Sequence, residues 1–129
     1  VDRAPALGVS VIQTLYNAIN TKAVETVLPS CQRQVLGVLA RGPLASGFLS
    51  GKYKVDAQFP DNDVRATRKP EVNAQQIAQA LEVLQQVPEN INAASWACAW
   101  CLQHPAISSV IPGIKTIEQL QINAAGADL

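Results

Sequence analysis

The stretch Ser108-Ser-Val-Ile-Pro-Gly-Ile-Lys-Thr-Ile-Glu-Gln-Leu-Gln-Ile-Asn123 decides how the fold of the chain is interpreted. The β-branched pair Val110-Ile111 favours a short strand that Pro112-Gly113 ends, and the pattern predicts a helix beginning at Thr116. A strand that turns directly into a helix leaves backbone N–H groups free at the positive end of the helix dipole, which suits phosphate. Lys115 adds a positive charge there. By itself, this stretch is equally consistent with a capped helix that binds nothing.

The composition is that of one globular domain. The chain has 129 residues, of which 48% are hydrophobic and 16% charged, so it is long enough to bury a core. Ten basic residues balance ten acidic ones, and a net charge of zero argues against nucleic acid or an anionic membrane as main partner. No apolar run approaches the roughly 20 residues that span a bilayer, and no signal peptide is visible. Because the chain starts at Val1 without Met, we expect a processed or cut chain.

The cysteines point to a reducing compartment. Cys31, Cys98 and Cys101 are an odd number in a chain too large to need disulfides, which predicts a cytoplasmic protein. Cys98 and Cys101 have the CxxC spacing of redox and metal sites, but they lie in a helical stretch and no second Cys/His pair completes a site. We therefore interpret them as buried helix thiols.

Strands and helices are predicted to alternate along the chain. Strands are expected over 9–16, 35–40 and 107–111, and helices over 21–31, 73–87, 92–103 and from 116 onward. Thr21 and Asn73 are the expected caps of the first two helices, and the connection over about 41–72 is expected to be a mobile surface loop. The second strand is nearly all apolar, which is typical of a strand buried on both faces.

This alternation predicts parallel strands joined by right-handed crossovers. Three such strands with helices on one side leave the other sheet face uncovered, which is a poor fold for an isolated domain. The same arrangement is expected in the C-terminal portion of a (β/α)8 TIM barrel, a fold of about 250 residues. We therefore expect residues 1–129 to form part of such a barrel.

Several segments resemble the aldo-keto reductase family. Val38–Tyr53 resembles the seventh strand and following loop of that family, and 94–105 resembles the helix before its eighth strand. The segment 111–123 is similar to the family's adenosine-phosphate segment, and the first strand, with Gln13 and Tyr16, matches the sixth. The resemblance covers nearly the whole chain in the right order and implies strands six to eight of an NADP-binding barrel.

The resemblance also implies a set of cofactor contacts. Gln13 matches the group that hydrogen-bonds the nicotinamide carboxamide, and Arg41 stands where many members have a Tyr that stacks on the nicotinamide ring. The loop beside the pyrophosphate matches Gly42, Pro43, Leu44, Ala45, Ser46 and Gly47. The turn and groups around the 2′-phosphate match Gly113, Lys115 and Thr116, while Gln119 and Asn123 match the adenine contacts. A cation at that phosphate favours NADP(H) over NAD.

The resemblance leaves the chemistry outside this chain. The family reduces carbonyl compounds with an Asp, Tyr, Lys and His set on its first four strands, and none of these strands is present. We expect the C-terminal half of an NADP-dependent oxidoreductase acting on small aldehydes or ketones, inactive as a separate segment. The alternative is a non-catalytic half-barrel that self-associates through its open sheet face. Whether a missing N-terminal half was lost or never encoded stays open.

Overall fold

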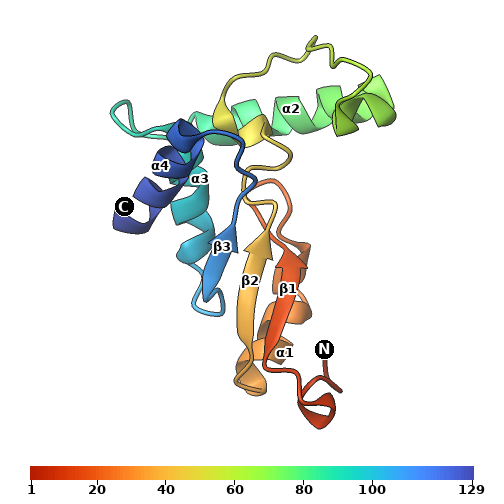
Figure 1. The fold of residues 1–129 in the computed structure, drawn as a ribbon, viewed down its shortest axis with the longest axis vertical. Coiled ribbons are helices and arrows are strands. Elements are labelled where there is room, and N and C mark those ends of the chain that lie inside the picture. The colour runs from red at the N-terminus through yellow and green to blue at the C-terminus, as the bar shows by residue number, and fades with distance from the viewer.

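Three parallel strands form the sheet of the computed structural model, which describes residues Val1–Leu129. They are β1 (Val11–Leu15), β2 (Gly37–Arg41) and β3 (Ser109–Ile111), and they lie side by side in that order (Figure 1). In the register of the sheet, Leu15 lies beside Arg41, and Arg41 lies beside Ile111. The predicted parallel strands are confirmed, although each is shorter than expected.

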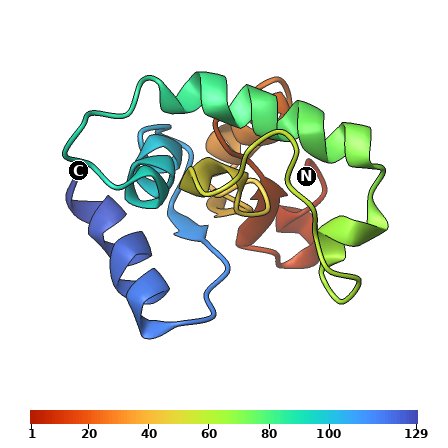
Figure 2. The ribbon, with the colours of Figure 1, turned by 90° about the horizontal axis from the view of Figure 1, so that it is seen from above.

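Four helices pack on one face and at one end of this sheet (Figure 1). They are α1 (Val27–Arg33), α2 (Pro70–Leu84), α3 (Ala93–Leu102) and α4 (Ile117–Ala124). Short 3₁₀ turns lie at Pro5–Leu7, Lys22–Val24, Phe48–Ser50, Val64–Thr67 and Ala125–Asp128. Figure 1 shows α2 lying across the end of the sheet toward which the strand arrows point. Seen from above in Figure 2, α2 and α4 lie on different sides of α3.

One face of the sheet is covered and the other is open. Val38 and Ala40 of β2 are fully buried against Leu28 of α1, Cys101 of α3 and their neighbours, which together form the main core. Alternate side chains point to opposite faces of a strand. On the other face, Val11 is 48% exposed and Ile111 is 38% exposed. The predicted uncovered face is therefore present.

A second core lies above the carboxyl ends of the strands. Its buried members are Phe48, Leu49, Ile77, Ala80 and Ala97, contributed by the connection after β2, by α2 and by α3. Burial of a side chain as large as Phe48 contributes roughly 1.5–3 kcal/mol. The spacing of Ile77, Leu81 and Leu84 predicts one buried apolar stripe on α2. Ile77 is buried, but Leu81 is 38% exposed, so that part of the prediction was wrong.

The first helix begins later than the sequence suggested. The Thr21 side chain makes no capping hydrogen bond, a 3₁₀ turn follows it, and α1 begins at Val27. Pro29 supplies the physical reason, because proline has no N–H and is tolerated only in the first turn of a helix. A helix running from residue 21 would place Pro29 in its interior. Val35, predicted to open the second strand, instead lies in a left-handed turn with φ 54° and is 91% exposed.

Asn73 does not cap α2. The helix begins at Pro70, whose ring fixes the backbone angle of a first helical residue, and it ends at Leu84 rather than at residue 87. Asn73 is buried inside the first turn, and its Nδ2 donates to the Arg65 carbonyl at 2.8 Å. Asn92 caps α3, since its Oδ1 accepts from the Ala94 N–H at 2.9 Å.

The predicted burial of α3 is confirmed, and the helix carries both thiols of the CxxC pair. Cys98 and Cys101 are free and fully buried, and the chain contains no cluster of three metal-ligating side chains. The following segment packs closely on α3 at Gly126, where a Cβ atom would lie 2.5 Å from the Ser95 carbonyl oxygen. None of the helices has the length and apolar character that a membrane crossing requires.

Candidate functional site

A cavity of about 900 Å³ lies beyond the carboxyl ends of β2 and β3. One wall is the connection after β2, and the other is the segment from Gly113 into α4. Most of the residues predicted to hold a cofactor line it: Gly42, Pro43, Leu44, Ser46, Gly47, Gly113, Lys115, Gln119 and Asn123. Two segments about 70 residues apart in sequence thus meet around one space of the size that binds small organic ligands.

The loop after β2 has an unusual backbone. Gly42, Ala45, Ser46 and Gly47 all have positive φ, at 65°, 48°, 60° and 89°. Left-handed conformations are uncommon for residues with a Cβ and persist only where the surroundings hold them. At Gly47 a Cβ atom would lie 3.4 Å from Arg65 Nη1. The loop is therefore held in one tight shape along the cavity wall.

The start of α4 is built as the sequence predicted. Thr116 Oγ1 accepts from the Gln119 N–H at 3.1 Å, which caps the helix. Gln119 Oε1 accepts from the Lys115 N–H at 2.8 Å, so this side chain also fixes the turn before the helix. Lys115 itself is exposed and forms no ion pair. The helix start therefore presents an unpaired cation at the mouth of the cavity.

Asn123 is an unsatisfied polar group in the cavity wall. Its side chain is 7% exposed, and its Nδ2 has no hydrogen-bond partner in the protein. Buried donors without a partner are rare because each costs about 1–3 kcal/mol. This orphaned donor at a cavity wall is what a ligand with a hydrogen-bond acceptor would satisfy.

A cluster around Arg65 closes one side of the cavity. Arg65 Nη2 lies 2.6 Å from Asp63 Oδ2, and the guanidinium carbon lies 4.7 Å and 4.4 Å from the ring centres of Tyr53 and Phe59. Arg65 Nη1 also donates to the Ser46 carbonyl at 3.2 Å. These contacts tie the distal part of the connection to the loop after β2. Whether the connection is mobile remains a prediction.

The charge state of Asp63 follows from this cluster. The side-chain hydrogen bond from Arg65 lowers the pKa of the Asp63 carboxyl well below its usual range, and the Arg65 backbone N–H lowers it further. Lys115 makes a smaller contribution of the same sign. The carboxylate therefore stays ionised and neutralises Arg65, which leaves Lys115 as a free positive charge of this cavity.

Four predicted residues lie outside the large cavity: Gln13, Arg41, Ala45 and Thr116. Gln13 is exposed on the open face of β1 and lines neither pocket. The Thr116 hydroxyl accepts the capping hydrogen bond from the Gln119 N–H and does not line the cavity. Arg41, at the end of β2, lines a separate small pocket together with Gly42 and Ser46. The structure therefore brings together the phosphate and adenine parts of the predicted set, but not the two nicotinamide contacts.

Sequence reasoning predicted none of the contacts of Arg65, and among its partners it assigned a role only to Ser46. The D-x-R spacing of Asp63 and Arg65 is compatible with a local ion pair, and this was the only signal present in the sequence. Tyr16, for which the sequence allows a barrel-mouth or a core position, is 4% exposed, and burial raises the pKa of its hydroxyl. Burial also raises the pKa of Cys98 to about 11 and that of Cys101 to about 12, so both thiols stay protonated and unreactive.

Comparison with known families identifies the chain. The model of the aldo/keto reductase family matches residues 1–128, and the chain therefore belongs to that family. Mb2320, an uncharacterized oxidoreductase of Mycobacterium bovis, is 32% identical over 130 residues, which is 96% of this chain and 39% of that protein. A probable voltage-gated potassium channel subunit beta of Arabidopsis thaliana is 33% identical over 137 residues, covering 99% of this chain and 41% of that protein.

A further relative carries a cofactor in its name. The aldo-keto reductase yakc of Schizosaccharomyces pombe, named for NADP(+), is 26% identical over 132 residues, or 95% of this chain and 38% of that protein. The chain thus spans about two fifths of the length of the relatives it matches.

Solved structures share the fold. The glycerol dehydrogenase AKR11B4 from Gluconobacter oxydans superposes with a TM-score of 0.69 at 20% identity, covering 90% of this chain and 36% of that one. The holo form of aldo-keto reductase AKR11C1 from Bacillus halodurans gives a TM-score of 0.64 at 20% identity, covering 92% of this chain and 37% of that one. The α/β arrangement with parallel strands is therefore shared with aldo-keto reductases.

Proposed function

We propose that this chain is the C-terminal, NADP-binding part of an aldo-keto reductase that reduces aldehydes or ketones. Its three strands would correspond to strands six to eight of a (β/α)8 barrel. The observation that carries the proposal is the cavity beyond β2 and β3, where ligands bind in parallel α/β folds. Its wall combines the strained loop after β2, the free Lys115 and the unsatisfied Asn123.

The residues present fit a nucleotide with a 2′-phosphate. Lys115 and the N–H groups at the start of α4 suit a dianionic phosphate, because both charge and hydrogen-bond donors face the same place. Asn123 Nδ2 lacks an acceptor, which a ring nitrogen of adenine would supply. Gly113 leaves the approach open, since nothing lies within 4 Å of the position of an added Cβ atom. The proposal therefore includes NADP(H) rather than NAD.

The nicotinamide end would lie nearer the open sheet face. A nicotinamide cofactor supplies the hydride for carbonyl reduction. Gln13 and Arg41 are both on strands whose exposed side chains face the interior of the proposed barrel, and we assign them to the nicotinamide end. Ser46 and Gly47 would then hold the pyrophosphate between the two ends.

We propose that neither tyrosine of this chain donates the proton to the carbonyl oxygen. Tyr16 is buried with a raised pKa, and Tyr53 packs against Arg65 in the cluster described above. We propose that the Asp, Tyr, Lys and His set of the family lies outside residues 1–129 and that the segment alone is inactive. The three free, buried thiols support the cytoplasmic setting proposed for it.

The open sheet face favours a second candidate function. Val11 is 48% exposed, Ile111 38%, and Ile117 on α4 75%, so several large apolar side chains face solvent in the isolated chain. In the first proposal, an N-terminal half of the barrel covers this face. In the alternative, a second copy of the chain covers it and forms a non-catalytic interaction module.

The cofactor proposal is tested by titrating the 129-residue chain with NADPH and NADH while following the fluorescence of Trp96 and Trp100. We expect saturable binding of NADPH and at least about tenfold weaker binding of NADH, since a charge-assisted hydrogen bond contributes about 1.5–3 kcal/mol. Absence of binding at millimolar NADPH would overturn the proposal for this chain. Reduction of any carbonyl compound by the pure chain would contradict the assignment of the chemistry to another segment.

The alternative is tested by sedimentation equilibrium. A stable dimer without NADPH binding supports the self-associating module. A monomer that binds NADPH supports the cofactor-binding part of a larger barrel. The two measurements are independent, so each proposal can fail separately.

A further inference from the structure

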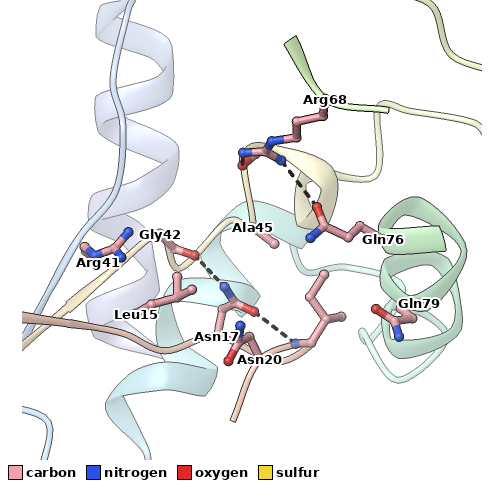
Figure 3. Close-up of a pocket in the computed structure, with 11 residues that line it drawn as sticks. Leu15, Asn17, Asn20, Arg41, Gly42, Ala45, Arg68, Gln76 and Gln79 are labelled. Atoms are coloured by element: carbon pink, nitrogen blue, oxygen red, sulfur yellow. Dashed lines mark hydrogen bonds between the residues drawn. The ribbon is translucent and has the colours of Figure 1, made fainter. Parts of the chain in front are cut away.

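A second, smaller pocket lies on the other side of the loop after β2. It has a volume of about 210 Å³ and is lined mainly by the turn after β1, the start of the loop after β2, and α2. Figure 3 shows Asn17 and Asn20 at its base, Gln76 and Gln79 on α2 at one side, and Arg68 above. Arg41, Gly42 and Ser46 in its lining also belong to the proposed cofactor contacts, whereas its other lining residues have no role there.

The shape of this pocket is fixed by hydrogen bonds. Asn17 is 2% exposed; its Nδ2 donates to the Gly42 carbonyl at 2.8 Å and its Oδ1 accepts from the Ile19 N–H at 3.1 Å. On the opposite side, Arg68 Nη2 donates to Ser46 Oγ at 2.9 Å, and its Nη1 donates to Gln76 Oε1 at 3.3 Å. Both walls are thus held to the loop between them, so the pocket is built into the fold.

The pocket is positive and contains no acid. Arg41 and Arg68 line it, and neither forms an ion pair; the single ion pair of the chain joins Asp63 to Arg65. Two of the five N–H groups of Arg68 are used within the protein, which leaves donors for a ligand. The remaining polar lining consists of the neutral amides of Asn17, Asn20, Gln76 and Gln79 and the Ser46 hydroxyl. Such a lining favours an anion over a cation.

Arg65 and Arg68 differ in a way that supports this conclusion. Both donate to Ser46, Arg65 to its carbonyl and Arg68 to its hydroxyl. The charge of Arg65 is balanced by Asp63, and its guanidinium lies against two aromatic rings. Arg65 therefore has its binding partners within the protein. The charge of Arg68 is not balanced. A guanidinium fork without a carboxylate partner is suited to bind one from a ligand.

The size and place of the pocket limit the ligand. A space of about 210 Å³ holds roughly seven waters at about 30 Å³ each, which is enough for a small organic acid and too little for a nucleotide. Leu15 and Arg41, which lie side by side at the ends of β1 and β2, form its edge toward the open sheet face. This is the end of the sheet to which the nicotinamide contacts are assigned.

We propose that this pocket binds the carboxylate of a small oxo acid, which makes oxo acids the substrate class of the reductase. The proposal rests on the proposed function, since it places the substrate beside the assigned cofactor site. The carboxylate accepts hydrogen bonds from Arg68 and the pocket amides, and Arg41 adds a second positive charge. Inorganic phosphate is the rival oxyanion with the same hydrogen-bonding chemistry.

The experiment compares three probes on the ¹⁵N-labelled 129-residue chain by NMR. Pyruvate carries the carboxylate, pyruvamide replaces it with an uncharged amide of similar size, and inorganic phosphate is the rival anion. We expect saturable shifts of the Asn17 and Asn20 side-chain amides with pyruvate in the millimolar range, about −4 kcal/mol. We expect no saturation with pyruvamide and weaker binding of phosphate.

A matched pair of variants tests the charge of the pocket. Gln79 lines the pocket, is exposed and makes no hydrogen bond, so Gln79→Glu adds a negative charge without breaking a contact. Gln75→Glu makes the same change on the same helix outside the pocket. We expect Gln79→Glu to weaken pyruvate binding about tenfold or more and Gln75→Glu to leave it within about twofold. Arg68→Gln should weaken it to a similar degree as Gln79→Glu.

Each of these measurements tests a different part of the proposal. If Gln75→Glu and Gln79→Glu weakened pyruvate binding equally, the effect would be one of net charge, and pyruvate would not bind in this pocket. Equal binding of pyruvate and pyruvamide would contradict a carboxylate site, and tighter binding of phosphate would reassign the pocket to that ion. Failure of the substrate proposal with intact NADPH binding leaves the proposed function standing. Pyruvate binding without NADPH binding would remove the proposed function and keep an anion pocket.

Discussion

Arg65 and Asp63 form the single ion pair of the chain, with Nη2 and Oδ2 2.6 Å apart. The Asp63 Oδ1 also accepts from the Arg65 backbone N–H at 2.8 Å and from its Nε at 2.9 Å. Through Arg65 Nη1 this pair reaches the Ser46 carbonyl, and through the Arg65 carbonyl it reaches Asn73 of α2. Asp63 and Arg65, two residues apart in the connection, thus link both ends of a segment that the sequence describes only as a long loop.

The first prediction concerns the pH dependence of this ion pair. The pKa of Asp63 is lowered in the folded chain from its usual 3.8, mainly by the Arg65 hydrogen bond. A lowered pKa means that the pair stabilises the folded chain above about pH 4 and that this contribution is lost as the pH falls below that value. We expect Asp63→Asn to lower Tm at pH 7 and the difference from the unmodified chain to shrink below pH 4. Asp61→Asn, on an exposed neighbour, is the control; a pH-independent difference for Asp63→Asn would contradict the prediction.

The second prediction concerns the cation before α4. Lys115 is exposed and unpaired at the mouth of the large cavity, so its removal breaks no contact of the folded chain. We expect Lys115→Ala to weaken NADPH binding by about tenfold to a hundredfold, the loss of one charge-assisted contact, and to change NADH binding little. Lys54→Ala removes an exposed cation outside both pockets and should leave both affinities unchanged. Equal losses for NADPH and NADH would show that Lys115 does not face the 2′-phosphate.

The sequence predicted the strands and the cap of α4 because these depend on short-range chemistry. Val110 and Ile111 favour extended backbone, and Thr116 with Gln119 forms a local capping pattern that the structure reproduces. The cap pattern at Thr21 predicts too early a start for the first helix, because it does not include Pro29, which α1 accepts only in its first turn. Local sequence rules therefore predicted the structure correctly where a single preference acts on a segment, as in β3 and at the start of α4.

The site was predicted unevenly for a related reason. The loop after β2 and the start of α4 were assigned through motifs, and the structure places them around one cavity. The cluster forms through contacts of Arg65 with Tyr53, Phe59 and Ser46, and no periodicity or motif encodes these contacts. The missing donor partner of Asn123 is also a property of packing, visible only once the surrounding side chains are placed.

The third prediction separates a ligand contact from a structural one. Asn123 Nδ2 has no partner, so Asn123→Leu removes a buried unsatisfied donor and should stabilise the free chain, by about 1 kcal/mol, while it weakens NADPH binding. Asn73 Nδ2 holds the Arg65 carbonyl, so Asn73→Leu should destabilise the chain by about 1–3 kcal/mol. Urea unfolding measures both changes. Destabilisation by Asn123→Leu with unchanged NADPH affinity would show that Asn123 serves packing alone.

The fourth prediction concerns the close contact that positions α4 and the chain end on α3. A Cβ atom at Gly126 would lie 2.5 Å from the Ser95 carbonyl oxygen and 2.9 Å from Cys98 Cβ, and neither backbone nor buried thiol can move aside freely. We expect Gly126→Ala to destabilise the chain by about 1–3 kcal/mol and to weaken NADPH binding, because Asn123 lies one turn earlier on the same segment. Gly113→Ala is the matched control for stability, since nothing lies within 4 Å of its added methyl group. Equal unfolding midpoints for the two variants would mean that the contact between this segment and α3 is looser than the structure shows.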